Sequence, residues 1–235
     1  MKSKLTRRKF VATSTLAAAP RSTPTAGFES KWRGNRVWIG PQYWANPLQD
    51  WRIEGDTVVV RAGENRTLHL LTHQTDTSIG GWWMSVRVTT PAGAGPDTSA
   101  GFRFGVRGLI EDYRHALVLY KQWVDAVVRV DGRLILDGET SAHTVPVTQA
   151  ITLELRVENG AAELRATAGG KTASVTKRLV GSRFRGNIAL VATARSEGGQ
   201  RKRNRAKAAT QSQQKDGWPI VYTLEKHNLE LCIIP

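Results

Sequence analysis

Short apolar runs separated by turn residues recur along the chain from residue 37 to residue 193. Residues 102–107 and 151–157 alternate strictly between apolar and polar positions, the two-residue period of a strand with one buried face. In the first of these runs, Phe102, Phe104 and Val106 are expected on one face. Similar runs occupy residues 58–60, 67–71, 84–88 and 187–192. The pattern predicts a domain built almost entirely of strands.

Three two-residue turns link consecutive runs. They are Asp131-Gly132, Asn159-Gly160 and Gly169-Gly170. Asn-Gly and Asp-Gly adopt positive φ readily, which suits the tight turn between two antiparallel strands. Consecutive hairpins of this kind predict an all-β fold, an antiparallel β-sandwich or jelly roll over residues 37–194.

The amino-terminal residues have the layout of a secretory signal. Arg7 and Arg8, with Phe10 two residues later, precede a weakly apolar stretch, and they resemble the twin-arginine export motif. Residues 1–26 are therefore predicted to be an export signal, cleaved before Pro20 or after Ala26; a basic amphipathic helix is the alternative. The expected partner is the twin-arginine export machinery, and the expected location is the periplasm or the cell exterior. Residues 27–36 are expected to form a linker.

The net charge of +14 suggests a nucleic-acid partner, but its distribution argues against one. Residues 37–194 carry seventeen Lys and Arg against fifteen Asp and Glu, so the basic excess lies in the end segments. Residues 195–217 are predicted to be a basic disordered segment, and residues 218–235 a tail that could supply one more strand. Because no stretch of eighteen apolar residues exists, no membrane span is expected. Because the folded part is nearly neutral, no specific nucleic-acid partner is expected; sequence-independent binding of nucleic acid through the basic residues 201–207 is the alternative.

Aromatic side chains are the candidates for ligand contact. Trp82 and Trp83 are adjacent and must point to opposite faces of a strand, so one is expected in the core and the other outside it. Aromatic rings stack on sugar rings and also fill sandwich cores. Trp82, Trp83, Trp123 and Tyr113 are therefore candidate carbohydrate-contacting residues, with core packing as the alternative.

Two groups of side chains are candidate metal ligands. Glu111 and Asp112 adjoin in a loop and offer the oxygen ligands that Ca²⁺ prefers, although a solvated turn explains them as well. His69 and His73, four residues apart in a strand-like run, are expected on the same face, where ordinary surface or core histidines are the alternative to a metal pair.

A pair of glutamates is the candidate for catalysis. Glu154 and Glu163 are expected to face each other across the Asn159-Gly160 hairpin, and a glycosidase needs two such carboxylates across a groove. Charged residues on an exposed face explain them equally well. The sequence contains no Gly-x-Ser-x-Gly motif and no phosphate-binding glycine loop.

Residues 38–52, WIGPQYWANPLQDWR, resemble the segment that opens exported alkaline-phosphatase-D-like (PhoD-like) metallophosphatases. Residues 70–73, 84–87, 100–108 and 111–114 add weaker similarities in the same order, and the export signal is similar too. The resemblance implies a concanavalin- or laminin-G-like sandwich that precedes a two-metal catalytic domain. The Asp-x-His and Gly-Asn-His motifs of that domain are absent here, since Ile188 follows Gly186-Asn187. The chain is therefore expected to be an exported, non-catalytic accessory or carbohydrate-binding module; a hydrolase (phosphatase, phosphodiesterase or glycosidase) is the alternative.

Overall fold

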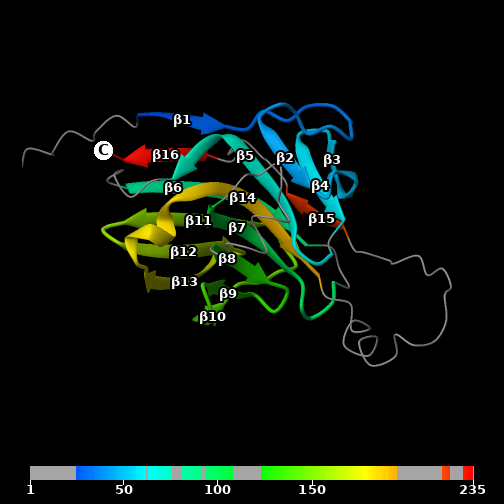
Figure 1. Cartoon of the computed structure of the whole chain (residues 1–235). Coiled ribbons are helices and arrows are strands. Elements are labelled where there is room, and N and C mark those ends of the chain that lie inside the picture. The colour runs from blue at the N-terminus through cyan, green and yellow to red at the C-terminus, as the bar shows by residue number, and fades with distance from the viewer. Residues whose placement is uncertain are drawn as a thin grey trace, which may run out of the picture.

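The computed structural model describes residues 25–61, 63–75, 81–90, 94–107 and 123–194, together with strands at 219–222 and 230–234. The strands are β1 (Thr25–Glu29), β2 (Tyr43–Asn46), β3 (Trp51–Glu54), β4 (Thr57–Arg61), β5 (Arg66–Thr75), β6 (Gly81–Thr89), β7 (Ser99–Val106), β8 (Val124–Arg129), β9 (Arg133–Leu136), β10 (Glu139–Thr144), β11 (Ile151–Glu158), β12 (Ala161–Ala168), β13 (Lys171–Arg178), β14 (Gly186–Thr193), β15 (Pro219–Tyr222) and β16 (Glu230–Ile234) (Figure 1). Two short 3₁₀ helices, η1 (Leu48–Asp50) and η4 (Gly181–Phe184), lie between strands.

The strands form two antiparallel sheets. Sheet A has the order β13-β12-β11-β6-β15-β4-β3, and β16 pairs with β6 beside β15 and carries β1 on its other side. Sheet B has the order β10-β9-β8-β7-β14-β5-β2. The predicted antiparallel β-sandwich is confirmed. No helix in the described part of the chain is long and apolar enough to cross a membrane.

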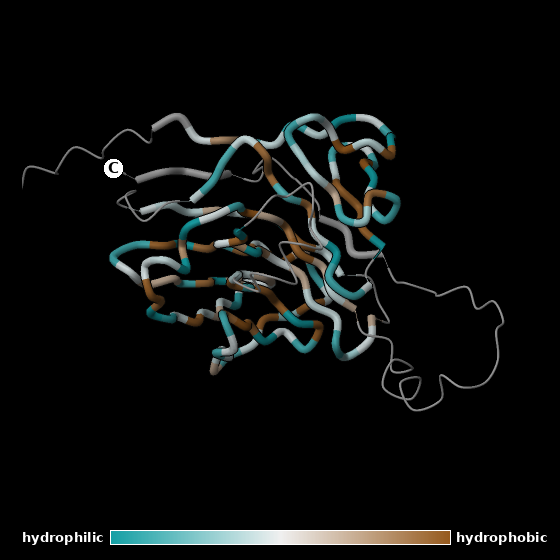
Figure 2. Tube along the Cα trace, in the orientation of Figure 1, coloured by the Kyte–Doolittle hydropathy of each residue, from teal (hydrophilic) through white to brown (hydrophobic). Residues whose placement is uncertain are grey.

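The core lies between the two sheets. Apolar residues from both sheets join one buried cluster, and the Trp82 ring of sheet A meets the Phe104 ring of sheet B edge-on at 5.3 Å. Hydrophobic and hydrophilic residues alternate along many of these strands (Figure 2). Burying a large apolar side chain contributes about 1.5–3 kcal/mol, so this alternation is the main source of the fold's stability.

The three predicted hairpins are all present, although at Asp131-Gly132 only Gly132 has a positive φ, of 80°. Asn159 and Gly160, with φ of 52° and 75°, join β11 to β12 in the expected left-handed conformation. The sequence contains a fourth turn of this kind, which was not predicted: Asp137 and Gly138, with φ of 46° and 86°, join β9 to β10. The Asp-Gly pair can be seen in the sequence, but the runs on either side of it are too short to predict two strands.

The expectation that Val106 shares a face with Phe102 and Phe104 is wrong. Between two paired positions β7 advances three residues, from Arg103 to Val106, while β14 advances two. This is a β-bulge, and Gly105 within it has a φ of 69°, which a glycine adopts without strain. The extra residue changes the alternation, so Val106 is buried but lies outside the core cluster.

The expectation that residues 27–36 form a linker is also wrong. Phe28 and Trp32 are buried, and their rings lie 6.2 and 5.9 Å from the Tyr43 ring. The Tyr43 hydroxyl donates a hydrogen bond to the Ser30 oxygen at 2.5 Å, and burial raises the pKa of Tyr43 to about 12. At the other end of the chain, β15 is the additional strand expected there and β16 is a second. The sandwich therefore includes segments on both sides of residues 37–194.

Candidate functional site

The face of sheet B that points away from the core carries a row of polar and aromatic residues. We call it the outer face of sheet B. Strand register places Trp44, His69, Ala189, Arg103 and Asp125 side by side on β2, β5, β14, β7 and β8. Ala189 lies outside the core cluster, whereas its neighbours on β14 belong to it. Four interstrand spacings separate the ends of the row, about 19 Å.

Arg103 is the central charge of this row. Its Nε lies 2.6 Å from Asp125 Oδ1 and its Nη2 lies 2.9 Å from Asp125 Oδ2, a bidentate pair. Its Nη1 donates to the side-chain oxygen of Asn65. Arg103 is buried, while the Asp125 side chain is 36% exposed. The pairing compensates for burying a guanidinium and leaves carboxylate surface facing solvent.

Trp123 lies against this ion pair and is half-buried. The Arg103 guanidinium is 4.6 Å from the centre of its ring, a cation–π contact. Its indole nitrogen donates to Asp125 Oδ2 at 3.3 Å, and Arg183 donates to its carbonyl oxygen at 3.0 Å. These contacts fix the ring. Trp123 is the sequence-predicted aromatic that the structure brings into a polar cluster.

The other aromatic candidates have different surroundings. Trp82 is 1% exposed and packs in the core, so it cannot stack on a ligand without opening the sandwich, and its candidacy is wrong. Trp83 is half-buried on the opposite face of β6, where it pairs with Arg156 of β11. The prediction that the two tryptophans point to opposite faces is confirmed. The candidates Tyr113, Glu111 and Asp112 lie outside the described residues, and so do the export-signal residues Arg7, Arg8 and Phe10.

His69 and His73 do not form the expected same-face pair. β5 advances four residues, from Leu70 to Gln74, while β14 advances one, so the alternation is interrupted between them. His69 lies in the row on β5, separated from Arg103 by Ala189 of β14. Burial, with a smaller contribution from the Arg103 charge, lowers the pKa of His69 to about 4. His73 packs against Phe28, with ring centres 5.1 Å apart, and burial lowers its pKa. Among the described residues, no group of three or more His, Cys, Asp or Glu could hold a metal ion.

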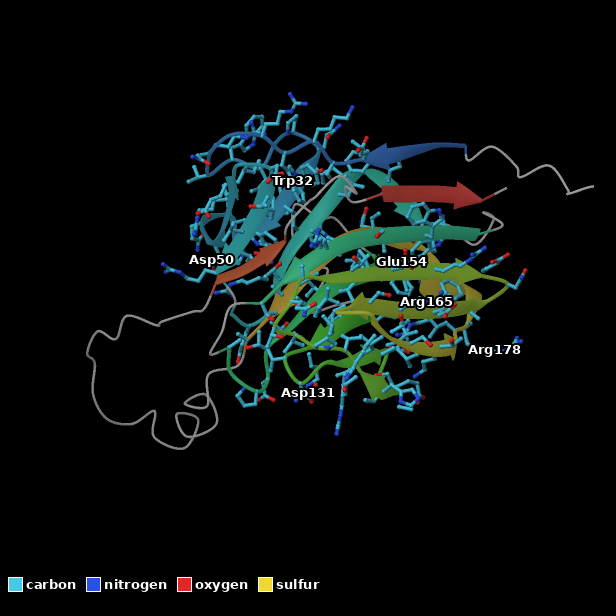
Figure 3. All side chains as sticks on the ribbon, turned by 180° about the vertical axis from the view of Figure 1, so that it is seen from behind. Trp32, Asp50, Asp131, Glu154, Arg165 and Arg178 are labelled. Atoms are coloured by element: carbon cyan, nitrogen blue, oxygen red, sulfur yellow. The ribbon has the colours of Figure 1, made fainter. Side chains whose placement is uncertain are left out.

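Glu154 and Glu163 do not face each other. The two-residue turn fixes the register so that Glu154 lies opposite Arg165 and Glu163 lies opposite Arg156. Figure 3 shows Glu154 and Arg165 on the strands of sheet A. Arg165 forms a 3.0 Å ion pair with Glu163 of its own strand. The expected catalytic geometry is therefore wrong, and these residues form a charged outer surface.

Sequence reasoning missed Arg103, Asp125 and Trp44 as site residues. Alternation within residues 102–107 already placed Arg103 opposite the core-facing phenylalanines. Its pairing with Asp125 needs the register between β7 and β8, which no tight turn connects. Trp44 is 39% exposed at the far end of the row, and only its pairing with His69 places it there.

Comparison with known proteins identifies the fold. No protein-family model and no curated protein sequence matches the chain. Lectin II from Ulex europaeus superposes with a TM-score of 0.56 and 6% identity, over 89% of this chain and 98% of the lectin. A lectin UEA-II complexed with galactose gives 0.56 and 8%, with the same shares of each chain. The exoplasmic/lumenal domain of VIP36 in its Ca²⁺/Man3GlcNAc-bound form gives 0.50 and 9%, over 89% of this chain and 88% of that domain. The chain therefore has the β-sandwich jelly-roll fold of legume lectins and L-type lectin domains.

Proposed function

We propose that this protein is an exported, non-catalytic β-sandwich module that binds carbohydrate on the outer face of sheet B. One observation carries the proposal: the Trp123 ring contacts both Arg103 and Asp125, at the opposite end of the polar row from Trp44. Binding sites combine apolar surface with a few well-placed polar groups, and this row has both.

The chemistry of the row suits a sugar. A pyranose ring presents apolar C–H groups on its faces and hydroxyl groups around its edge, so it stacks on an indole and hydrogen-bonds to charged groups beside it. Arg103 covers one face of the Trp123 ring, so a sugar would stack on the second face. Asp125 would accept a hydrogen bond from a sugar hydroxyl with the part of its carboxylate that faces solvent. The galactose-bound and Man3GlcNAc-bound lectins of the same fold support this choice of ligand class.

Export and a phosphatase context belong to the same proposal. Arg7, Arg8 and Phe10 support the twin-arginine route, and residues 38–52 support kinship with the sandwich of PhoD-like metallophosphatases. Cleavage before Pro20 would keep β1 whole, whereas cleavage after Ala26 would remove its first two residues. We therefore expect the exported protein to begin at Pro20. Amino-terminal sequencing of the exported protein tests this, and a start at Gly27, or retention of the signal, would contradict it.

The binding experiment uses the full chain on a glycan array, followed by calorimetry with the best neutral oligosaccharide. Trp123→Ala is expected to weaken binding by roughly tenfold or more, because an aromatic anchor of an interface contributes on this scale. Trp83→Ala on sheet A is the matched control and should leave the affinity unchanged. Equal effects of the two substitutions, or no glycan binding at all, would contradict the proposed face.

Catalysis is tested separately. Purified full-length protein should not hydrolyse phosphomonoesters, phosphodiesters or the bound glycan when Ca²⁺, Mn²⁺ or Fe is supplied. Metal-dependent turnover that survives further purification would overturn the non-catalytic part of the proposal and leave the binding face to be judged by the substitutions above.

A further inference from the structure

A hollow of about 620 Å³ opens on the outer face of sheet B, beyond the bulge at Gly105. Its floor is a second transverse row, in which Gln74, Asn187 and Val106 pair in register across β5, β14 and β7. Arg107, Arg185 and the first residues of η4 line its sides. We call it the arginine hollow. Asn187 is two residues from Ala189 on β14, about 7 Å along the strand, so the hollow adjoins the proposed carbohydrate row.

The hollow is positively charged. Arg107 and Arg185 line it, and among the residues that the structure describes no acidic one does. Within the described part of the chain, neither arginine has a carboxylate within ion-pair distance, in contrast to Arg103 and Arg183, which pair with Asp125 and Asp137. Arg107 donates one N–H to the carbonyl oxygen of Ser182 in η4, which directs its guanidinium along the wall. Two guanidinium groups that have no carboxylate partner among the described residues favour an oxyanion in a polar hollow.

The floor adds a second, independent indication of a ligand. Asn187 is 4% exposed, and its side-chain nitrogen donates to the Val106 carbonyl oxygen at 3.4 Å. Its side-chain oxygen has no hydrogen-bond partner in the described part of the chain. A buried amide oxygen without a donor is uncommon in a folded protein. A ligand hydroxyl that enters the hollow would supply the missing donor.

We infer that the arginine hollow binds the oxyanion of an acidic sugar, with the anionic group on Arg107 and Arg185 and a neighbouring hydroxyl donating to Asn187. This inference rests on the proposed function and narrows its ligand class from carbohydrates in general to anionic polysaccharides. A carboxylate and a sulfate ester share this chemistry. The first is a planar acceptor and the second a tripodal one, and a guanidinium binds either through two N–H groups. A single sugar chain can contact both the hollow and Trp123, because the two adjoin on one face.

The test compares matched oligosaccharides on the full-length protein by calorimetry: neutral, uronic-acid and sulfated chains of equal length. The double substitution Arg107→Gln, Arg185→Gln is expected to weaken binding of the acidic chains by at least about tenfold and leave the neutral chain unchanged. The control is Arg133→Gln, Arg178→Gln, which removes two charges from exposed positions outside the hollow (Figure 3 labels Arg178) and should change affinity by less than about twofold. Arg185→Gln alone removes an exposed side chain, so its effect does not depend on the Arg107 contact with η4.

The outcomes separate the inference from the proposed function. A uronate preference or a sulfate preference identifies the source of the oxyanion. Equal losses in the hollow variant and the control would mean that the net charge of +14 alone attracts polyanions, and would overturn the inference. Neutral binding that needs Trp123, without any gain from acidic groups, overturns the inference and leaves the proposed function standing. Conversely, if no glycan binds but inorganic sulfate shifts the Arg side-chain NMR signals of the native protein and not of Arg185→Gln, the oxyanion site stands and the carbohydrate function falls.

Discussion

The outer faces of the two sheets both carry arginines and carboxylates, but they use them differently. On sheet A, Arg165 and Glu163 pair along one strand, and so do Arg156 and Glu158, with side chains 34–57% exposed. On sheet B, Arg103 is buried, pairs bidentately with Asp125 across two strands and lies over Trp123. Buried polar residues cluster on the same face of sheet B: Asn46, Thr67, His69, Arg103 and Asn187.

This difference distinguishes a solvated charged surface, on sheet A, from a candidate binding site, on sheet B. Exposed ion pairs contribute between zero and about 1 kcal/mol, because water and salt screen them, so sheet A needs no function to explain its charges. A buried guanidinium costs much more to desolvate and persists only where the surrounding groups satisfy it. The concentration of such groups on one face of sheet B is what makes that face the candidate site.

The largest expected effect concerns the backbone that shapes the outer face of sheet B. A Cβ at Gly105 would meet the carbonyl oxygen of Arg183, whereas a Cβ at Gly160, in a turn of sheet A with a similar φ, would meet nothing within 4 Å. Gly105→Ala should therefore cost about 3–4 kcal/mol of unfolding free energy, from left-handed strain plus overpacking, and Gly160→Ala about 1–2 kcal/mol. Urea denaturation of both variants measures the difference. Equal costs would show that the close approach at the bulge is not tight.

The second-largest effect is expected at the buried ion pair of Arg103 and Asp125. Asp125→Ala leaves the Arg103 charge buried without its carboxylate, and we expect a loss of about 3 kcal/mol. Glu163→Ala on sheet A is the control and should cost less than about 0.5 kcal/mol, since its partner Arg165 is half-exposed. Thermal and urea unfolding report both values. If Asp125→Ala were as mild as Glu163→Ala, the contrast between the two faces would fail.

A dependence on pH should follow from His69. Its pKa is about 4 in the folded protein against 6.5 ordinarily, so between these values the unfolded chain binds a proton that the folded chain does not. Stability should therefore fall as the pH falls from about 6.5 to 4, by on the order of 2–3 kcal/mol, and this contribution should level off below 4. His69→Gln should flatten the decline relative to the native protein, and His143→Gln, at an exposed position, should not. A decline unchanged in His69→Gln would contradict the assignment.

The smallest effect is expected on sheet A. The double substitution Glu154→Gln, Glu163→Gln should change the unfolding free energy by less than about 0.5 kcal/mol and leave glycan affinity unchanged. Repeating the measurement at 1 M salt should remove even this difference, because exposed charges are then screened within about 3 Å. A tenfold loss of glycan affinity would instead move the ligand face to sheet A.

Local pattern predicted most of the strands and several of their turns, because each needs only neighbouring residues. The alternation at 151–157 and the Asn159-Gly160 turn were enough for the β11–β12 hairpin. The same reasoning failed at Val106, where one extra residue in β7 reversed the alternation, and between His69 and His73, where β5 contains a larger irregularity. It also failed for Phe28 and Trp32, because the Pro, Thr and Gly residues around them predicted a linker.

The sequence by itself determined the two-residue period, the turns and therefore an antiparallel sandwich, because period and turn geometry are properties of short segments. It also placed Trp82 and Trp83 on opposite faces. Only the tertiary structure decided that Trp82 is core, that Arg103 meets Asp125 and Trp123, and that Asn187 forms the floor of the arginine hollow. The reason is that these contacts join strands that are distant in sequence, and their register is set by bulges and by the packing of one sheet on the other.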